Sequence, residues 1–273
     1  MGQSLDGRLV LLTGASSGIG RAAAAIFVER GARVLGVARS AERLATLSRE
    51  VGGSSRLVAL PADVADAASM EALASRVREE FGTPDVIVAN AGIGLDALLA
   101  ETDDDALRTV FEVNVYGLVR TVRPFLPAMV DRGSGRILLV SSIVGKRGVP
   151  HYSAYSASKF ALHGIADALR SELWSSGVSV GVICPSSTKT GFHSRLLERG
   201  PRQRRVRPRR QSAETVARAL VKMATNRRVE QIVTVEGKLM TLVDCLAPRL
   251  IDWILARALT GVKSRALSGA GRR

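Results

Sequence analysis

Residues 9–20 read LVLLTGASSGIG, and this stretch decides the fold class. Four consecutive apolar residues predict a buried strand, and the glycines that follow predict a tight turn leading into a helix. Glycine lets the backbone approach a diphosphate closely, and the first amides of the helix then face the phosphate oxygens. A glycine cluster in this strand–turn–helix context predicts a dinucleotide site. The residues expected at this site are Gly14, Ser16, Ser17, Gly18, Ile19 and Gly20.

Beyond this turn, short apolar runs alternate with amphipathic stretches over most of the chain. Near-continuous apolar strands are typical of a parallel sheet covered on both faces, and their alternation with helices is typical of a doubly wound α/β fold. We therefore predict a single domain, a Rossmann-type parallel sheet of about seven strands with helices on both faces and extra C-terminal helices. The expected strands are 8–12, 33–37, 57–60, 86–89, 137–140, 178–183 and 231–235. The expected helices are 19–30, 41–51, 67–81, 103–131, 156–176 and 213–225.

The composition excludes several classes of protein. The chain has 273 residues, 46% hydrophobic and 23% charged, as in a packed globular domain. Cys184 and Cys245 are too few for a disulfide framework or a metal cage, so no metal is expected. Since no run of about 18 uncharged apolar residues is present, a membrane-spanning helix is not expected either. We expect a cytoplasmic protein.

The formal net charge is +14, and it is unevenly distributed. Half of the surplus lies between residues 192 and 210, where eight arginines are opposed by Glu198 alone. Two interpretations stay open, a binding surface for an anionic partner and a solvated loop. Nucleic-acid binding is not expected, because Phe192 is the only aromatic residue in this run and no recognition motif is present.

Residues 239–260 form an apolar extension beyond the last predicted strand. Pro248 is expected to break a helix there. The piece after it has a wide apolar face, interrupted by Arg249, Asp252 and Arg257. Such a face can pack on the protein core, on a second subunit or on a membrane surface, and packing within protein is the commoner outcome. Residues 261–273 are expected to form a mobile tail.

The end of the second predicted strand indicates which dinucleotide is bound. A carboxylate at this position binds the ribose hydroxyls of NAD, whereas an arginine accepts the 2′-phosphate of NADP. The strand ends in Gly36-Val37-Ala38-Arg39-Ser40 and holds no carboxylate. The sequence therefore favours NADP(H) over NAD(H), with Arg39 at the 2′-phosphate.

Tyr155 and Lys159 lie four residues apart at the start of a predicted helix, so their side chains share one helix face. A tyrosine phenol has a pKa of about 10, and an adjacent ammonium lowers it. Bringing that pKa to about 7 requires roughly 4 kcal/mol, which a partly desolvated lysine and an oxidised nicotinamide can supply together. Such a phenol exchanges a proton with a carbonyl or alcohol oxygen. Tyr152 lacks this arrangement, because Ser156 stands four residues after it.

Five motifs occur along the chain in a fixed order. They are Thr13 to Gly20, Asn90-Ala91-Gly92, Asn114, Ser141-Ser142, and Tyr155 with Lys159. Ser142 precedes Tyr155 by 13 residues. In these motifs, residues 8–235 resemble the short-chain dehydrogenase/reductase (SDR) family, here with a C-terminal extension. One departure is Pro185-Ser186, where the family usually has Pro-Gly.

The resemblance implies a role for each matched residue. Tyr155 would be the catalytic acid/base, and Lys159 would lower the pKa of Tyr155 and bind the nicotinamide ribose. Ser142 would polarise the substrate carbonyl, and Asn114 would hold a water that connects Lys159 to solvent. Eight further residues would line the dinucleotide site: Asp63, Val64, Asn90, Ala91, Gly92, Pro185, Thr188 and Thr190.

The resemblance also implies an oxidoreductase that interconverts a ketone or aldehyde and an alcohol. Relatives with C-terminal additions act on lipids, steroids or retinoids, so we expect a hydrophobic substrate, and peripheral membrane contact stays open. A homo-oligomer, dimer or tetramer, is usual in the family, and residues 186–211 would form a basic substrate lid. Two alternatives remain. One is a β-ketoacyl thioester reductase, whose acidic carrier would dock on the arginines, and the other is a non-catalytic NADP-sensing regulator.

Overall fold

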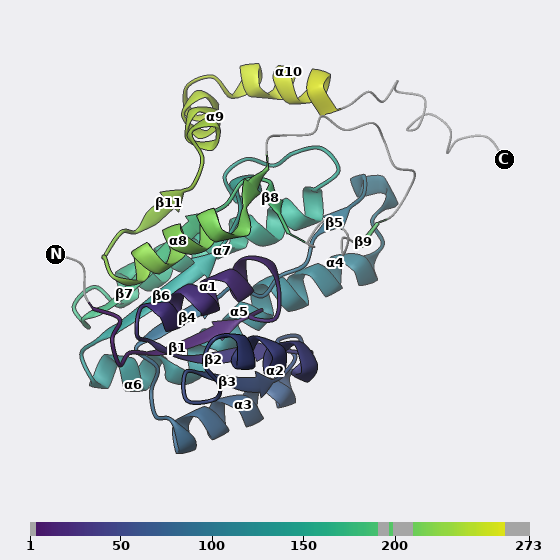
Figure 1. Ribbon diagram of the computed structural model, residues 1–273. Coiled ribbons are helices and arrows are strands. Elements are labelled where there is room, and N and C mark those ends of the chain that lie inside the picture. The colour runs from purple at the N-terminus through teal and green to yellow at the C-terminus, as the bar shows by residue number, and fades with distance from the viewer. Residues whose placement is uncertain (1–3, 191–196, 199–209, 260–273) are drawn as a thin grey trace.

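A seven-stranded parallel sheet forms the centre of the computed structural model, which describes residues 4–190, 197–198 and 210–259 (Figure 1). The strand order is β11-β7-β6-β4-β1-β2-β3, that of a doubly wound sheet. This confirms the predicted Rossmann-type fold, and all seven predicted strands are present. They are β1 (Leu9–Thr13), β2 (Arg33–Ala38), β3 (Leu57–Pro61), β4 (Val86–Ala89), β6 (Gly135–Val140), β7 (Val178–Cys184) and β11 (Glu230–Ile232).

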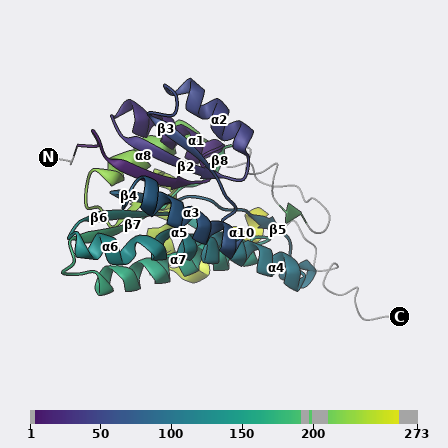
Figure 2. The ribbon, with the colours of Figure 1, turned by 90° about the horizontal axis from the view of Figure 1, so that it is seen from below.

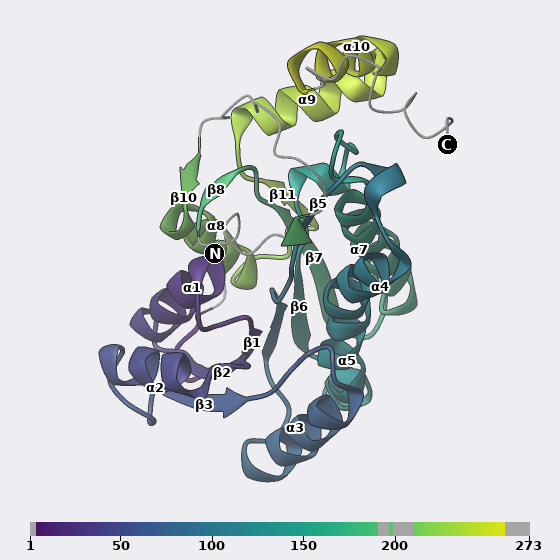
Figure 3. The ribbon, with the colours of Figure 1, turned by 90° about the vertical axis from the view of Figure 1, so that its right-hand side faces the viewer.

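Helices cover both faces of the sheet (Figures 2 and 3). One layer contains α1 (Gly18–Glu29), α2 (Ala41–Glu50) and α8 (Ala213–Ala224), and the opposite layer contains α3 (Ala67–Glu80), α5 (Gly117–Val122) and α7 (Ser153–Glu172). Side chains of β1 alternate between the two layers. Leu11 belongs to the core under α3, α5 and α7, whereas Val10 and Leu12 belong to the core under α1 and α8. Burial on both faces explains why the strands are apolar at nearly every position.

The prediction of one continuous helix over 103–131 was wrong. The segment contains α4 (Asp104–Phe111), a π-helical turn (Glu112–Tyr116), α5, a 3₁₀ turn (Arg123–Phe125) and α6 (Leu126–Asp131). Pro124 and Pro127 lack an amide hydrogen and therefore interrupt the helical hydrogen bonds. The π-helical turn contains Asn114, and such turns are frequent at functional sites.

Two predicted boundaries were also wrong. α7 begins at Ser153 rather than at Ser156, so Tyr155 lies in its first turn. β11 ends at Ile232 rather than at residue 235, because Thr234 caps the helix that follows. The Oγ1 atom of Thr234 accepts a hydrogen bond of 3.1 Å from the amide of Gly237.

The C-terminal extension starts earlier than the predicted residue 239. It forms α9 (Val235–Leu246) and α10 (Pro248–Leu259), which pack against each other at one end of the molecule (Figure 1). Pro248 separates them as predicted, and it opens α10, where its missing amide hydrogen costs nothing. Among the described side chains of these helices only Gly237 and Ile251 are buried, so the expected packing within the chain is slight. No helix among the described residues is long and apolar enough to span a bilayer.

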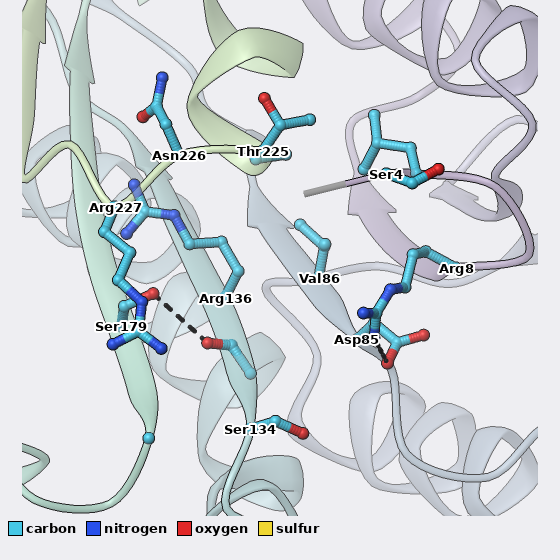
Figure 4. A pocket seen from close by; sticks show the side chains of 14 residues that line it. Ser4, Arg8, Asp85, Val86, Ser134, Arg136, Ser179, Thr225, Asn226 and Arg227 are labelled. Carbon is cyan, nitrogen blue, oxygen red and sulfur yellow. Dashed lines mark hydrogen bonds and ion pairs between the residues drawn. The ribbon is translucent and has the colours of Figure 1, made fainter. Parts of the chain in front are cut away.

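A hollow of about 350 Å³ lies at the amino ends of the strands (Figure 4). Arg8 forms a 3.1 Å ion pair with Asp85 there. The buried Arg136 donates from Nε to the carbonyl oxygen of Met223 at 3.1 Å and from Nη2 to that of Arg228 at 2.6 Å. These bonds fasten the end of α8 to the sheet, which is a structural role.

Candidate active site

The candidate residues lie at the opposite end of the sheet, after the carboxyl ends of four neighbouring strands. Thr13 ends β1, Asn90 follows β4, Ser142 follows β6 and Pro185 follows β7. Parallel strands all end at the same edge, and the chain leaves β1 and β4 in opposite directions. Ligands of open α/β sheets bind at such a point.

The glycine turn after β1 is packed too tightly for side chains. A Cβ atom on Gly20 would lie 2.2 Å from the carbonyl oxygen of Gly14, and one on Gly14 would lie 2.7 Å from Nδ2 of Asn90. Gly14 and Gly18 also have φ angles of +70° and +55°, which favour glycine. Asn90 holds the turn in place, because its Nδ2 donates to the carbonyl oxygen of Thr13 at 2.9 Å.

The turn fits the diphosphate of a dinucleotide. Ser17 is the N-cap of α1, so the first amides of this helix follow the turn directly. Those amides and the positive end of the helix dipole together bind phosphate. Thr190 borders the same turn, since a Cβ atom on Gly18 would lie 3.1 Å from its Cγ2.

Arg39 lies directly after β2, at the same edge of the sheet as the glycine turn. The amide of Ala15 donates to the carbonyl oxygen of Val37 at 3.1 Å, so the turn containing Ser16 lies beside the end of β2. Arg39 follows that strand, is exposed and forms no salt bridge with any described residue. Its guanidinium is therefore available to an anion.

Asp63 and Val64 follow β3 at the same edge of the sheet. The Oδ1 atom of Asp63 accepts a 3.0 Å hydrogen bond from the amide of Ala65. Val64 is buried against α5, because a Cβ atom on Gly117 would lie 2.9 Å from it. Their contact with the adenine stays a prediction.

The hydroxyl groups of Tyr155 and Ser142 lie close enough to interact. Burial raises the pKa of Tyr155 to about 12, and the interaction with Ser142 opposes this rise. Lys159 Nζ lies 5.8 Å from the centre of the Tyr155 ring. Burial dominates here, so the phenol is protonated at neutral pH. The lowering of its pKa by Lys159 together with an oxidised nicotinamide stays a prediction.

Lys159 is buried beside the strand end that precedes Ser142. Its Nζ donates to the carbonyl oxygen of Val140 at 3.0 Å, and Ser141 Oγ donates to the carbonyl oxygen of Lys159 at 3.1 Å. Burial lowers the pKa of Lys159 to about 8. A Cβ atom on Gly92 would lie 3.3 Å from Lys159 Nζ and 3.0 Å from Asn114 Oδ1. Three of the predicted motifs therefore meet at this point.

Asn114 connects the π-helical turn to two other segments. Its Oδ1 accepts from the amide of Ile93 at 2.8 Å, and its Nδ2 donates to the carbonyl oxygen of Ile93 and to Ser158 Oγ, both at 2.9 Å. Its role in holding a water stays a prediction. Ser158 was not among the predicted site residues, although its position directly before Lys159 could have indicated it.

Ser186 replaces the glycine that is usual in the family without straining the backbone. Among described residues other than glycine only His151 has a positive φ, of 68°. Ser186 Oγ instead forms a 2.7 Å hydrogen bond with Thr234 Oγ1, directly before α9. The Pro185 carbonyl accepts from the amide of Ile143 at 2.9 Å, and Thr188 is buried next to this segment.

Most of the predicted basic lid falls on residues 191–196 and 199–209, which lie outside the described residues. The flanking parts of the segment form two short parallel pairs. β8 (Thr188–Lys189) pairs with β10 (Gln211–Ser212), and β9 (Leu197–Glu198) pairs with β5 (Leu95–Asp96). The predicted tail 261–273 also lies outside the described residues.

A model of the short chain dehydrogenase family matches residues 8–200. The chain belongs to this family. It is 34% identical to the ketoacyl reductase HetN of Nostoc sp. over 259 residues, which cover 92% of this chain and 89% of HetN. The fold is also similar to a short-chain dehydrogenase from Streptomyces avermitilis, with a TM-score of 0.81, 28% identity, and coverage of 91% of this chain and 97% of that one.

A second solved short-chain dehydrogenase contains a nucleotide. The alcohol dehydrogenase of Thermococcus sibiricus, complexed with 5-hydroxy-NADP, has a TM-score of 0.73 and 27% identity and covers 83% of this chain and 96% of its own. As a short-chain dehydrogenase, the protein is an oxidoreductase that binds a nicotinamide dinucleotide and acts on carbonyl or alcohol groups. The comparisons support an enzyme over the alternative of a non-catalytic NADP-sensing regulator.

Proposed function

We propose that the protein uses NADPH to reduce a ketone or aldehyde on a hydrophobic substrate. The observation that carries this proposal is the juxtaposition of Ser142 and Tyr155 at the same sheet edge as the glycine turn. Two hydroxyl groups at one point suit the recognition of a single carbonyl oxygen.

The residues supply hydrogen bonds and a proton. When bound, NADPH supplies the hydride. Ser142 stabilises the negative charge that develops on the carbonyl oxygen, and Tyr155 gives that oxygen its proton. Tyr155 holds this proton at neutral pH and can therefore donate it. Lys159, with a pKa of about 8, is mainly charged at neutral pH and stabilises the phenolate that forms.

The preference for NADPH is supported by Arg39. It is exposed at the end of β2, and no carboxylate stands there to repel a 2′-phosphate. The complex of the Thermococcus sibiricus enzyme with an NADP derivative shows that a protein of similar fold can hold this dinucleotide.

A second candidate is the reduction of a β-ketoacyl thioester. The similarity to HetN, a ketoacyl reductase, over nearly the whole chain favours it. The proposal of a hydrophobic ketone is supported instead by the apolar extension, which touches the segment after Ser142. A Cβ atom on Gly237 of α9 would lie 3.2 Å from Ile143 Cδ1.

We also propose that the protein works as a homodimer or homotetramer. Exposed apolar side chains on the helices of one face support this, among them Tyr116 at 55% exposure and Phe160 at 44%. Burial of such side chains between subunits is a common source of association energy.

The experiment is a turnover assay with the purified full chain, NADPH or NADH, and three substrate classes. These are long-chain ketones, short water-soluble ketones and β-ketoacyl thioesters. We expect NADPH to be consumed with the long-chain ketones. Turnover should fall at least about 1,000-fold in Tyr155→Phe while NADPH still binds. Tyr152→Phe, whose ring stands edge-on to Tyr155 at 6.4 Å, is the matched control and should retain activity.

Two outcomes would change the assignment. Turnover confined to β-ketoacyl thioesters establishes the second candidate. A wild-type protein that binds NADPH but reduces none of the three classes contradicts both.

A further inference from the structure

Helices α9 and α10 carry large apolar side chains that are exposed. On α9, Leu239 (60% exposed), Leu242 (57%) and Leu246 (76%) follow one stripe at helical spacing. On α10, Leu250, Trp253 and Ile254 are exposed in the same pattern, with Trp253 at 53%. These six side chains are called the α9–α10 face below. Exposed apolar faces of this kind mark interaction surfaces.

The charges that remain unpaired around this face are mostly basic. Lys238 and Arg249 are exposed and form no salt bridge with a described residue. Of the three acids of the two helices, Asp244 and Asp252 share Arg147, and the exposed Glu236 forms no salt bridge with a described residue. In sequence, residues 260–273 directly follow α10 and hold four basic residues and no acid.

Trp253 and Arg257 form a pair suited to the boundary between water and lipid. The guanidinium carbon of Arg257 lies 4.4 Å from the centre of the Trp253 ring. Tryptophan at such a boundary places its ring among apolar groups, while arginine extends its charged end toward the headgroups.

We propose that the α9–α10 face lies on the surface of an anionic lipid bilayer, in the plane of its interface. A second copy of the chain is the other partner to consider. In a twofold dimer the same face of each copy would meet, which would bring the two sets of basic residues together. Anionic headgroups attract these residues instead, while the leucine stripe enters the acyl boundary.

The proposal deepens the proposed function, because the two helices are fastened to the segment that follows Ser142. Arg147 lies in this segment and holds both α9 and α10 through its two carboxylate partners. The bond between Ser186 and Thr234 ties the start of α9 to the strand end after β7. A hydrophobic ketone dissolved in the bilayer would therefore reach the sheet edge that holds Ser142 and Tyr155 without crossing bulk water.

The chain has two tryptophans, Trp174 and Trp253, which makes a clean optical test possible. Trp174 follows α7 and is 89% exposed. The Trp174→Phe protein, with Trp253 as its one reporter, is mixed with phosphatidylcholine vesicles that do or do not contain phosphatidylglycerol. We expect it to float with the anionic vesicles and its emission to shift to the blue. In the Trp253→Phe protein, Trp174 is the remaining tryptophan, and its emission should not shift when the protein binds to the vesicles.

A second pair of variants tests the stripe itself. Exchange of Leu242→Ser together with Leu246→Ser should weaken vesicle binding about tenfold or more, because less apolar surface enters the interface. Leu99→Ser removes an equally exposed leucine from another part of the surface (71% exposed) and should bind as wild type. Turnover of a short water-soluble ketone should stay unchanged in both proteins.

Three results would overturn the proposal. They are no flotation with anionic vesicles, flotation without a change in Trp253 emission, and a lipid-free dimer that the Leu242→Ser, Leu246→Ser protein no longer forms in light scattering. The last result assigns the face to a second copy. If the protein floats with anionic vesicles and its Trp253 emission shifts, but no ketone is reduced, the membrane proposal is supported. Only the proposed function is then contradicted.

Discussion

Asn114 and Ser158, which are 44 residues apart in sequence, are joined by a 2.9 Å hydrogen bond from Asn114 Nδ2 to Ser158 Oγ. Ser158 Oγ in turn donates to the carbonyl oxygen of Tyr155 at 2.7 Å. The π-helical turn is thereby fixed to the first turn of α7, where the proposed proton donor stands.

Removing this hydroxyl should cost stability and activity together. In Ser158→Ala the buried amide of Asn114 loses a partner, so we expect the free energy of unfolding to fall by about 1–3 kcal/mol. Urea denaturation measures this loss, and kcat should fall more than the affinity for NADPH. Ser171→Ala, which removes an exposed hydroxyl of α7 with a 3.4 Å bond, is the control. Equal losses in the two variants would contradict the connection described here.

Arg39→Asp should reverse the preference for the dinucleotide. The carboxylate repels a 2′-phosphate and accepts hydrogen bonds from ribose hydroxyls, so kcat/KM should fall about 100-fold for NADPH and rise for NADH. Steady-state kinetics with both dinucleotides measure the ratio. Arg49→Asp, at the other end of α2, makes the same charge change and should leave the ratio as it is. An unchanged ratio in Arg39→Asp would place the 2′-phosphate elsewhere.

Two glycine-to-alanine exchanges should affect different properties, one the binding of NADPH and the other the stability of the fold. A Cβ atom on Gly20 meets the carbonyl oxygen of Gly14 at 2.2 Å, so Gly20→Ala should open the turn and abolish NADPH binding in calorimetry. Gly164, exposed within α7, has nothing within 4 Å of its added Cβ atom. Gly164→Ala should therefore raise the free energy of unfolding by about 0.5–1 kcal/mol and leave binding intact. Retained binding in Gly20→Ala would refute the assignment of the turn.

The buried Lys159 should make stability depend on pH. An unfolded lysine keeps its proton up to about pH 10.5, whereas burial makes the folded one lose it near pH 8. Between these values the unfolded state binds more protons, so the contribution of Lys159 to stability rises with pH. Lys159→Met lacks this contribution. The free energy of unfolding of wild type minus that of the variant should therefore increase from about pH 8 to pH 10.5, and a constant difference in urea denaturation would show that Lys159 is not desolvated.

The seven strands could be predicted because burial on both faces leaves a continuous apolar signal. The breaks within residues 103–131 were missed because the apolar pattern continues through Pro124 and Pro127, although both prolines were visible in the sequence. The start of α9 was missed for a different reason. Thr234 acts as a cap only because β11 ends before it, and that ending depends on pairing with β7.

The candidate site was predictable as a set of residues and less so as a set of contacts. Motif order places Asn90, Ser142 and Tyr155 at one sheet edge, where the structure has them. Arg147 and Asp252, which form an ion pair, are 105 residues apart in sequence, and no local sequence pattern predicts such a contact. The sequence names the cation near Tyr155 but does not give the depth of burial, which raises the pKa of the phenol.

Every residue assigned here to the reaction lies at or before Thr190, and all seven strands of the sheet are complete by Ile232. The chain passes into α9 only once, through Val233 and Thr234. The extension is therefore separate from the sheet in the chain and yet in contact with the segment after Ser142, through Arg147 and Thr234. A change in α9 or α10 can thus reach the substrate side of the site while the sheet and the glycine turn keep their own connections.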